Sequence, residues 1–211
     1  FHVIALTEEG WLAGELIRIV LSMSPRDLEE PLREALHSKD YLLQCLAIYL
    51  IGKTADEELL HMLAAFYRKP VGDADRLERL EKKSYDALVE GAEKAPASLF
   101  STWLKDRSSR VRALAVTVLA AREVPEAVLG LAGLILIDAK TRNRAAQVLL
   151  RYAENDVFRW DPDDPQAAAI AEMLARAKEP ALSKLVETLM RDESPDVRQV
   201  AIYFVGLMPS P

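Results

Sequence analysis

Three stretches of the chain repeat one pattern: "DRSSRVRALAVTVLA" (residues 106–120), "DAKTRNRAAQVLLRYA" (residues 138–153) and "DESPDVRQVAIYFVG" (residues 192–206). Each stretch begins with an aspartate, continues through a polar turn and has an arginine six residues after the aspartate. A run of apolar residues with helical spacing follows. The repetition predicts a helix that begins in a turn and is built at least three times.

The apolar stripe after each turn marks the helix face that should pack into a core, because offsets of 0, 3, 4, 7 and 8 residues share one side of a helix. Three segments carry it: Val111, Leu114, Ala115, Val118 and Leu119; Val197, Val200, Ala201, Phe204 and Val205; Leu43, Leu46, Ala47, Leu50 and Ile51. After Asp138 the pattern is weaker, because Asn143 and Gln147 interrupt it. The best stripe there is Ala145, Val148, Leu149 and Tyr152.

Each turn is also preceded by a segment with helical periodicity, so the repeating unit is a pair of helices. One hairpin cannot bury its own stripe, whereas stacked hairpins bury each other's, and repeats of about 30–45 residues are typical of α-solenoids. We expect an all-α, right-handed α-solenoid that forms a single domain over residues 1–211. Its predicted parts are a leading helix at 8–23, hairpins at 25–53, 56–93, 96–121, 124–154 and 180–207, an insertion at 154–165 and an extra helix at 165–178.

The repeated motif resembles HEAT repeats, of the short variety also seen in lyase-like helical-repeat proteins of bacteria. The matching residues are Asp106, Val111, Arg112 and Ala115, then Asp192, Val197, Arg198, Ala201 and Gly206. The resemblance covers about residues 25–207 and implies a hydrogen-bonded ladder between neighbouring repeats. The implied ladder residues are Asp106, Arg112, Asp138, Arg144, Asp192 and Arg198. The first hairpin departs from the pattern, with Ser38 and Gln44 at the aspartate and arginine positions.

The composition restricts the class of protein. With 211 residues, 50% of them hydrophobic, the chain can bury a sizeable core. One cysteine, Cys45, excludes a disulfide within the chain and a cysteine-based zinc cluster. The longest apolar run, residues 127–137, is too short to cross a bilayer. We therefore expect a cytoplasmic protein. Because there is no initiator methionine, we expect either missing sequence before Phe1 or a processed or excised domain.

Charge is distributed unevenly along the chain. Residues 101–151 hold nine basic and four acidic residues, a net charge of +5, inside a chain whose net charge is −6. Equivalent positions of a solenoid line up along one edge, so these cations should form a stripe. The candidate binding stripe consists of Arg107, Arg110, Lys140, Arg142 and Arg151. It is either a solvated edge or a patch that binds an anionic partner.

The insertion contains Phe158 and Trp160, a candidate loop anchor for a partner. The alternative, which we favour, is that these rings pack on the helices. Asp161, Asp163 and Asp164 lie beside them, but their spacing does not fit a calcium loop, and aspartate is also what turns and helix caps require.

The sequence contains little evidence of a catalytic site. Glu58 and His61 have the Glu-x-x-His spacing of carboxylate-bridged metal sites, yet such sites need a second pair, and the chain has three histidines. Cys45 lies beside an apolar stripe, and no motif supplies a base for it. We find no catalytic constellation, phosphate-binding glycine motif, metal site or cofactor site, and expect a protein that is not an enzyme.

Three functions fit this sequence. The first is a scaffold that binds a partner protein. If the candidate binding stripe takes part, that partner is acidic. The uncapped ends of the array also allow a homodimer. The second is nucleic-acid binding, as in the HEAT-like DNA glycosylases that the architecture resembles. The residues for this role would be Trp103, Trp160 and Asp161, but no motif of that family matches around them. The net negative charge of the chain also argues against nucleic-acid binding. The third, implied only by the resemblance, is a lyase-like or chaperone-like role toward a pigment or cofactor protein.

Overall fold

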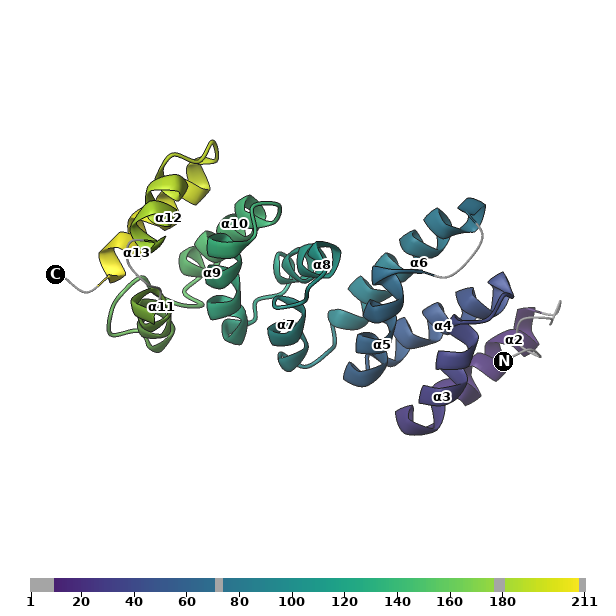
Figure 1. Ribbon diagram of the computed structural model, residues 1–211. Helices are drawn as coiled ribbons and strands as arrows, with labels where there is room; N and C mark the ends of the chain where they lie inside the picture. Colours follow the sequence, from purple (N-terminus) through teal and green to yellow (C-terminus); the bar gives the residue numbers. More distant parts are fainter. Residues whose placement is uncertain (1–9, 71–73, 177–180, 209–211) are drawn as a thin grey trace. The chain divides into compact units, whose positions relative to one another are not determined.

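The computed structural model describes residues 10–70, 74–176 and 181–208, which form twelve α-helices, one short 3-10 helix and no strand (Figure 1). The predicted all-α class is confirmed for this part of the chain. The contacts divide the chain into two compact units, Phe1–Leu99 and Phe100–Pro211, where the sequence pattern predicts one continuous domain.

The first unit contains five helices: α2 (Gly10–Leu21), α3 (Pro25–Leu36), α4 (Tyr41–Thr54), α5 (Glu57–Arg68) and α6 (Ala74–Ala92). α4 lies at its centre and packs against α3, α5 and α6, with α6 its most extensive neighbour (Figure 1). Leu50 and Ile51 of α4 and Leu60 and Leu63 of α5 are fully buried. The first two predicted hairpins therefore share one core.

Two glycines allow α4 and α6 to approach each other closely. A Cβ atom added to Gly52 would lie 2.9 Å from both the Cβ and the carbonyl oxygen of Ala87 on α6. One added to Gly91 of α6 would lie 3.1 Å from the carbonyl oxygen of Gly52 on α4 and 2.6 Å from Cδ2 of Leu60 on α5. The Lys53 ammonium bonds the Glu90 carboxylate beside this contact. The absence of side chains, rather than glycine's backbone freedom, is what this contact requires.

We expect Gly52→Ala to lower the free energy of unfolding by about 1–3 kcal/mol, because the new methyl group meets the backbone of α6 and the helices must separate. Gly14→Ala is the matched control, since a Cβ there has nothing within 4 Å. Urea denaturation of both variants measures the effect. Equal stability of the two would contradict the close helix contact.

The second unit contains α8 (Ser109–Leu119), a 3-10 helix η1 (Pro125–Ala127), α9 (Val128–Ile137), α10 (Arg142–Glu154), α11 (Pro165–Arg176), α12 (Ala181–Met190) and α13 (Pro195–Leu207). The boundary between the units falls inside the short helix α7 (Ser98–Trp103). These helices and α7 lie within the predicted hairpins at 96–121, 124–154 and 180–207 and the predicted extra helix at 165–178, and the hairpin predicted from residue 124 starts as a 3-10 helix. Residues 8, 9, 71–73 and 177–180, which the predicted helices and hairpins include, lie outside the described residues.

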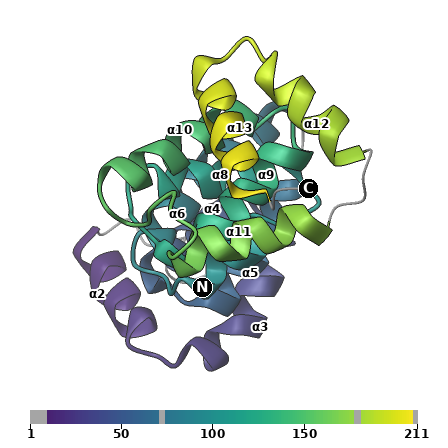
Figure 2. The same cartoon turned by 90° about the vertical axis from the view of Figure 1, so that its left-hand side faces the viewer.

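α10 holds the second unit together. It packs against α9, α8 and α13, and Figure 2 shows α11 beside α13, which it contacts together with α9. Tyr152 of α10 is fully buried. Its hydroxyl accepts a hydrogen bond from the Val124 amide (3.1 Å), and its single proton is shared between the carbonyl oxygens of Arg122 (2.8 Å) and Leu119 (3.1 Å). One side chain thus fixes the connection between α8 and η1 from the next hairpin.

Candidate functional site

Each repeated turn is closed by a side chain that accepts a hydrogen bond from the backbone two residues ahead. Asp106 accepts from the Ser108 amide (2.7 Å), Asp138 from the Lys140 amide (3.0 Å) and Asp192 from the Ser194 amide (3.0 Å). Ser38 does the same with the Asp40 amide (3.0 Å). The four turns therefore share one geometry, and a serine hydroxyl replaces the carboxylate in the first.

Arg112 connects two successive hairpins. Its Nη1 donates to the carbonyl oxygen of Asp106 (2.7 Å), and its Nε donates to Oδ2 of Asp138 in the next turn (2.7 Å). The side chains are 18% and 6% exposed, so the ion pair is largely removed from water. Burial acts to raise the pKa of Asp138, but the hydrogen bonds from Arg112 and the Lys140 amide outweigh it and lower that pKa below its ordinary value.

The next connection is made by Arg142, which is a correction to the sequence interpretation. Arg144 was assigned to the ladder, but it is exposed. Nη1 of Arg142 instead lies 3.6 Å from Oδ2 of Asp192, and its Nε donates to the carbonyl oxygen of Ile135 (2.9 Å). The cause is a longer turn, because the first core residue comes seven positions after Asp138, at Ala145, and only five after the aspartate in the other two stretches. Counting the arginine from the apolar stripe would have shown that Arg144 does not match Arg112.

Arg198 and Gln44 form local bonds in the same position. Arg198 is exposed and donates to the carbonyl oxygens of Asp192 (2.7 Å) and Glu193 (2.9 Å). Gln44 is buried and donates to the carbonyl oxygen of Leu36 (3.1 Å).

The structure divides the candidate binding stripe into two groups. Arg107 and Lys140 are exposed in the turns that precede α8 and α10, and Arg110 and Arg144 are exposed in the first turns of these two helices. Arg142 and Arg151 are half-buried. Arg142 pairs with Asp192 as above, and Arg151 donates to the carbonyl oxygen of Leu119 (3.2 Å), so these two side chains serve the packing of the helices.

The aromatic pair of the insertion packs on the helices, which is the arrangement that the sequence analysis favours over a loop anchor. Phe158 is 2% exposed. The Trp160 ring stacks on Tyr203 of α13, with centroids 4.7 Å apart and planes 5° from parallel, and meets Phe158 edge to face at 4.9 Å. Asp164 caps α11 by accepting from the Gln166 amide (2.8 Å). The insertion therefore folds back onto α13, and its rings fill space between helices.

Sequence reasoning missed an apolar groove in the second unit. It has a volume of about 640 Å³ and lies between the ends of α7, α9, α11 and α12. α9 is apolar on two faces: one is buried, and the other exposes Leu129 (41%) and Ile137 (77%). Lys105 and Arg176 are the cations at its margin, with Glu126 the single acid. The feature of the sequence that could have indicated the groove is the run "VLGLAGLILI". A helix of this composition is apolar on every face and is normally buried on all sides.

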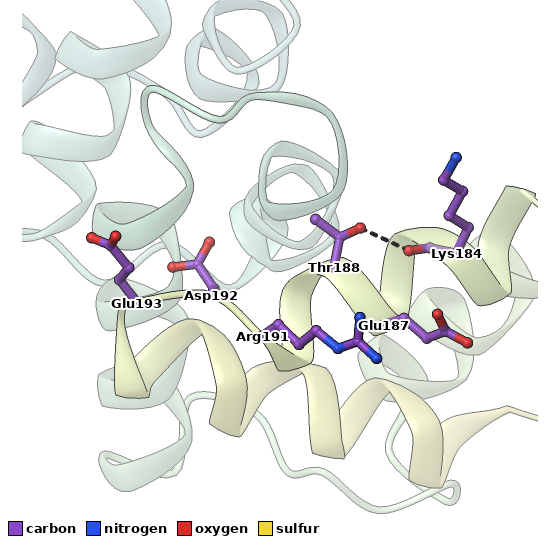
Figure 3. Close-up of a pocket in the computed structure, with 6 residues that line it drawn as sticks. All are labelled: Lys184, Glu187, Thr188, Arg191, Asp192 and Glu193. Carbon is purple, nitrogen blue, oxygen red and sulfur yellow. Dashed lines mark hydrogen bonds between the residues drawn. The ribbon is translucent and has the colours of Figure 1, made fainter.

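A second hollow, about 530 Å³, lies along α12 and the turn before α13 (Figure 3). Figure 3 shows its lining as charged and polar side chains: Lys184, Glu187, Thr188, Arg191, Asp192 and Glu193. The Thr188 hydroxyl donates to the carbonyl oxygen of Lys184 (2.8 Å). Opposite charges nearly cancel here, and this hollow has the character of an ordinary solvated surface.

The remaining candidate residues stay apart. Nε2 of His61 lies 3.8 Å from Oε1 of Glu57, while Glu58 is exposed, and Cys45 is a half-buried free thiol. Trp103, considered for nucleic-acid contact, is fully buried. Within residues 10–70, 74–176 and 181–208 there is no group of three or more His, Cys, Asp or Glu side chains placed to hold a metal ion. No helix in the same ranges has the length and apolarity to span a bilayer.

The sequence matches no model of a known protein family, and a search of curated proteins gives no significant match.

Proposed function

We propose that the protein is a non-enzymatic interaction scaffold, an α-solenoid of HEAT-like hairpins whose second unit binds an acidic, amphipathic segment of a partner protein. The observation that carries the proposal is the groove beside α9. Contiguous exposed apolar surface on a soluble protein is a common mark of a protein-binding site. Here it is concave, and its apolar walls come from four helices.

The charges around the groove favour an acidic partner. Lys105, which lines the groove, and Arg107, which is exposed, stand on either side of Asp106 at the end of α7. Ile137 lines the groove at the end of α9, and the exposed Lys140 follows three residues later. Apolar side chains of a partner would enter the groove while its carboxylates meet these cations, which gives both affinity and orientation.

A cytoplasmic location belongs to the same proposal, since Cys45 is a free thiol. Nucleic acid is the competing ligand for the basic turns. Its strength of binding would fall steeply with salt, and it would not need the apolar groove.

The test is capture of partners by the tagged protein from its own cell extract, with and without nuclease, followed by mass spectrometry. One variant, Ile137→Glu, places a charge in the groove at a position too exposed to matter for folding. A second reverses Lys140 and Arg144 to Glu. The matched control reverses Lys82 and Lys83, two exposed cations of α6 in the first unit.

We expect a nuclease-resistant protein that is retained by the wild type and the control and is reduced at least about tenfold by each of the other two variants. Equal capture by all four proteins would contradict the groove as the site. A catch that disappears with nuclease and depends on Lys140 and Arg144 but not on Ile137 would establish nucleic acid as the ligand.

A further inference from the structure

The floor of the groove beside α9 is open at one residue, Gly133. A Cβ atom added to Gly133 would have Sδ of Met173 as its neighbour at 3.9 Å, which is an ordinary van der Waals distance. Gly130, three residues earlier, differs, because a Cβ atom there would lie 2.6 Å from Cδ1 of Leu104. Close packing therefore explains Gly130, whereas no contact in the described part of the chain requires a glycine at position 133.

The missing side chain of Gly133 gives the groove room for a ligand. Gly133 lies in the interior of α9, where glycine is an unfavourable residue for a helix. It lines the groove, and the space over the helix backbone at this point is left unfilled. The volume of about 640 Å³ lies within the range of about 300–1,000 Å³ that is usual for small-molecule sites.

The lining of the groove suits a ligand with a long apolar body and one negatively charged end. Ten of the fourteen lining residues are apolar or glycine, and the four polar ones are Ser101, Lys105, Glu126 and Arg176. The three charged side chains are exposed, so they lie at the rim of the groove. A polar group inside the groove would lose its hydrogen bonds to water, which disfavours a polar body. Two cations against one acid favour an anionic end.

We propose that the groove binds a medium-chain fatty acid, with its alkyl chain over Gly133 and its carboxylate at the cations of the rim, and that this ligand excludes the partner segment. An alkyl chain brings no polar group onto the apolar floor, whereas a peptide backbone carries N–H and C=O groups that must be paired. At the rim, Arg176 bonds Glu172 in a pair whose side chains are 81% and 71% exposed, and such a pair opens at little cost to accept the ligand.

A free fatty acid is favoured over an acyl chain that remains in a membrane. The net charge of −6 repels the surface of an anionic bilayer, whereas a dissolved fatty acid can reach two local cations. The exclusion of the partner rests on the proposed function, because it requires the partner segment to use the same groove. The binding of the fatty acid itself does not depend on a partner.

The test is calorimetric titration of the full chain with dodecanoate, below the concentration at which it forms micelles. We expect saturable binding at a single site. Decanoate should bind about tenfold more weakly, because it lacks two methylene groups that the groove buries. Dodecyltrimethylammonium has the same alkyl chain and a positive head, and it should also bind at least about tenfold more weakly. This comparison is demanding, since the net charge of −6 attracts the cation to the protein surface in general.

Two variants locate the ligand. Gly133→Leu fills the floor of the groove, and leucine is a better helix former than glycine, so α9 should keep its structure while dodecanoate binding falls by at least about tenfold. Reversal of Lys105 and Arg176 to Glu should weaken the binding of dodecanoate and strengthen that of dodecyltrimethylammonium. Loss of folding cannot produce such an exchange of preference. The matched control again reverses Lys82 and Lys83 of α6 and should leave both affinities unchanged.

No binding of dodecanoate, or binding that Gly133→Leu leaves unchanged, would overturn the proposal. Sedimentation with phosphatidylglycerol vesicles tests the other source of an acyl chain. Vesicle binding that Gly133→Leu abolishes, in a protein that does not bind dodecanoate, would replace the free fatty acid with a membrane lipid.

Addition of dodecanoate to the capture experiment tests the exclusion. We expect a saturating concentration to release the partner, and a partner that stays bound would overturn this part of the proposal. If dodecanoate binds but capture does not depend on Ile137, the proposed function alone fails. If capture depends on Ile137 but dodecanoate does not bind, this inference alone fails.

Discussion

Tyr152→Ala is expected to lower the free energy of unfolding of the second unit by about 3–5 kcal/mol, the usual cost of truncating a fully buried aromatic side chain. Tyr152 is 0% exposed, and α10 contacts three other helices. The ring therefore leaves a cavity that neighbouring helices cannot fill without moving. Thermal or urea unfolding, followed by circular dichroism, measures the loss.

Tyr152→Phe separates the hydroxyl from the ring. It keeps the packing but leaves the Val124 amide and the Arg122 carbonyl oxygen without their partner, which should cost about 1–3 kcal/mol. Burial raises the pKa of Tyr152, so the hydroxyl remains a donor across the ordinary pH range. A Phe variant as unstable as the Ala variant would mean that the hydrogen bonds, and not the ring, hold the connection.

The helices and the turn motif could be predicted from the sequence because both are local properties. The stripe from Val111 to Leu119 fixes one helix face, and an aspartate that caps its own turn needs no distant partner. The partners of individual side chains depend on longer-range geometry, which the pattern does not supply. Arg142 takes the bridging position because two extra residues rotate the start of α10, and Trp160 packs because Tyr203, over forty residues away, provides a ring to stack on.

The groove was missed for a different reason. Helical periodicity identifies the buried face of a helix only when one face is apolar and the opposite face is polar. Because α9 has apolar residues on both faces, the pattern does not show which face is buried. Only the arrangement of the helices around α9, with α10 its most extensive neighbour, decides that Leu131 and Ile135 are covered while Leu129 and Ile137 are exposed. Whether such an apolar face is buried or exposed therefore depends on helices that are distant in the sequence.

Arg112→Ala should lower the free energy of unfolding by about 3 kcal/mol. This value is at the upper end of the cost of losing a hydrogen bond to a charged group and at the lower end of the cost of breaking a buried ion pair. The truncation leaves the 6% exposed Asp138 carboxylate without its cation. Arg198→Ala is the matched control, because it removes the same residue from the same motif at an exposed position. Its expected cost is below about 0.5–1 kcal/mol, so comparable losses in the two variants would contradict the different burial of the two arginines.

The pH dependence of this difference identifies its cause. The pKa of Asp138 is lowered in the folded protein, so the stability that the ion pair contributes is present above the unfolded value of about 3.9 and is lost as the pH falls through the folded value. The wild type and Arg112→Ala should therefore differ fully at pH 7 and converge in acid below about pH 4. A difference that persisted unchanged at pH 3, measured by urea unfolding, would assign the effect to the packing of the Arg112 side chain rather than to its charge.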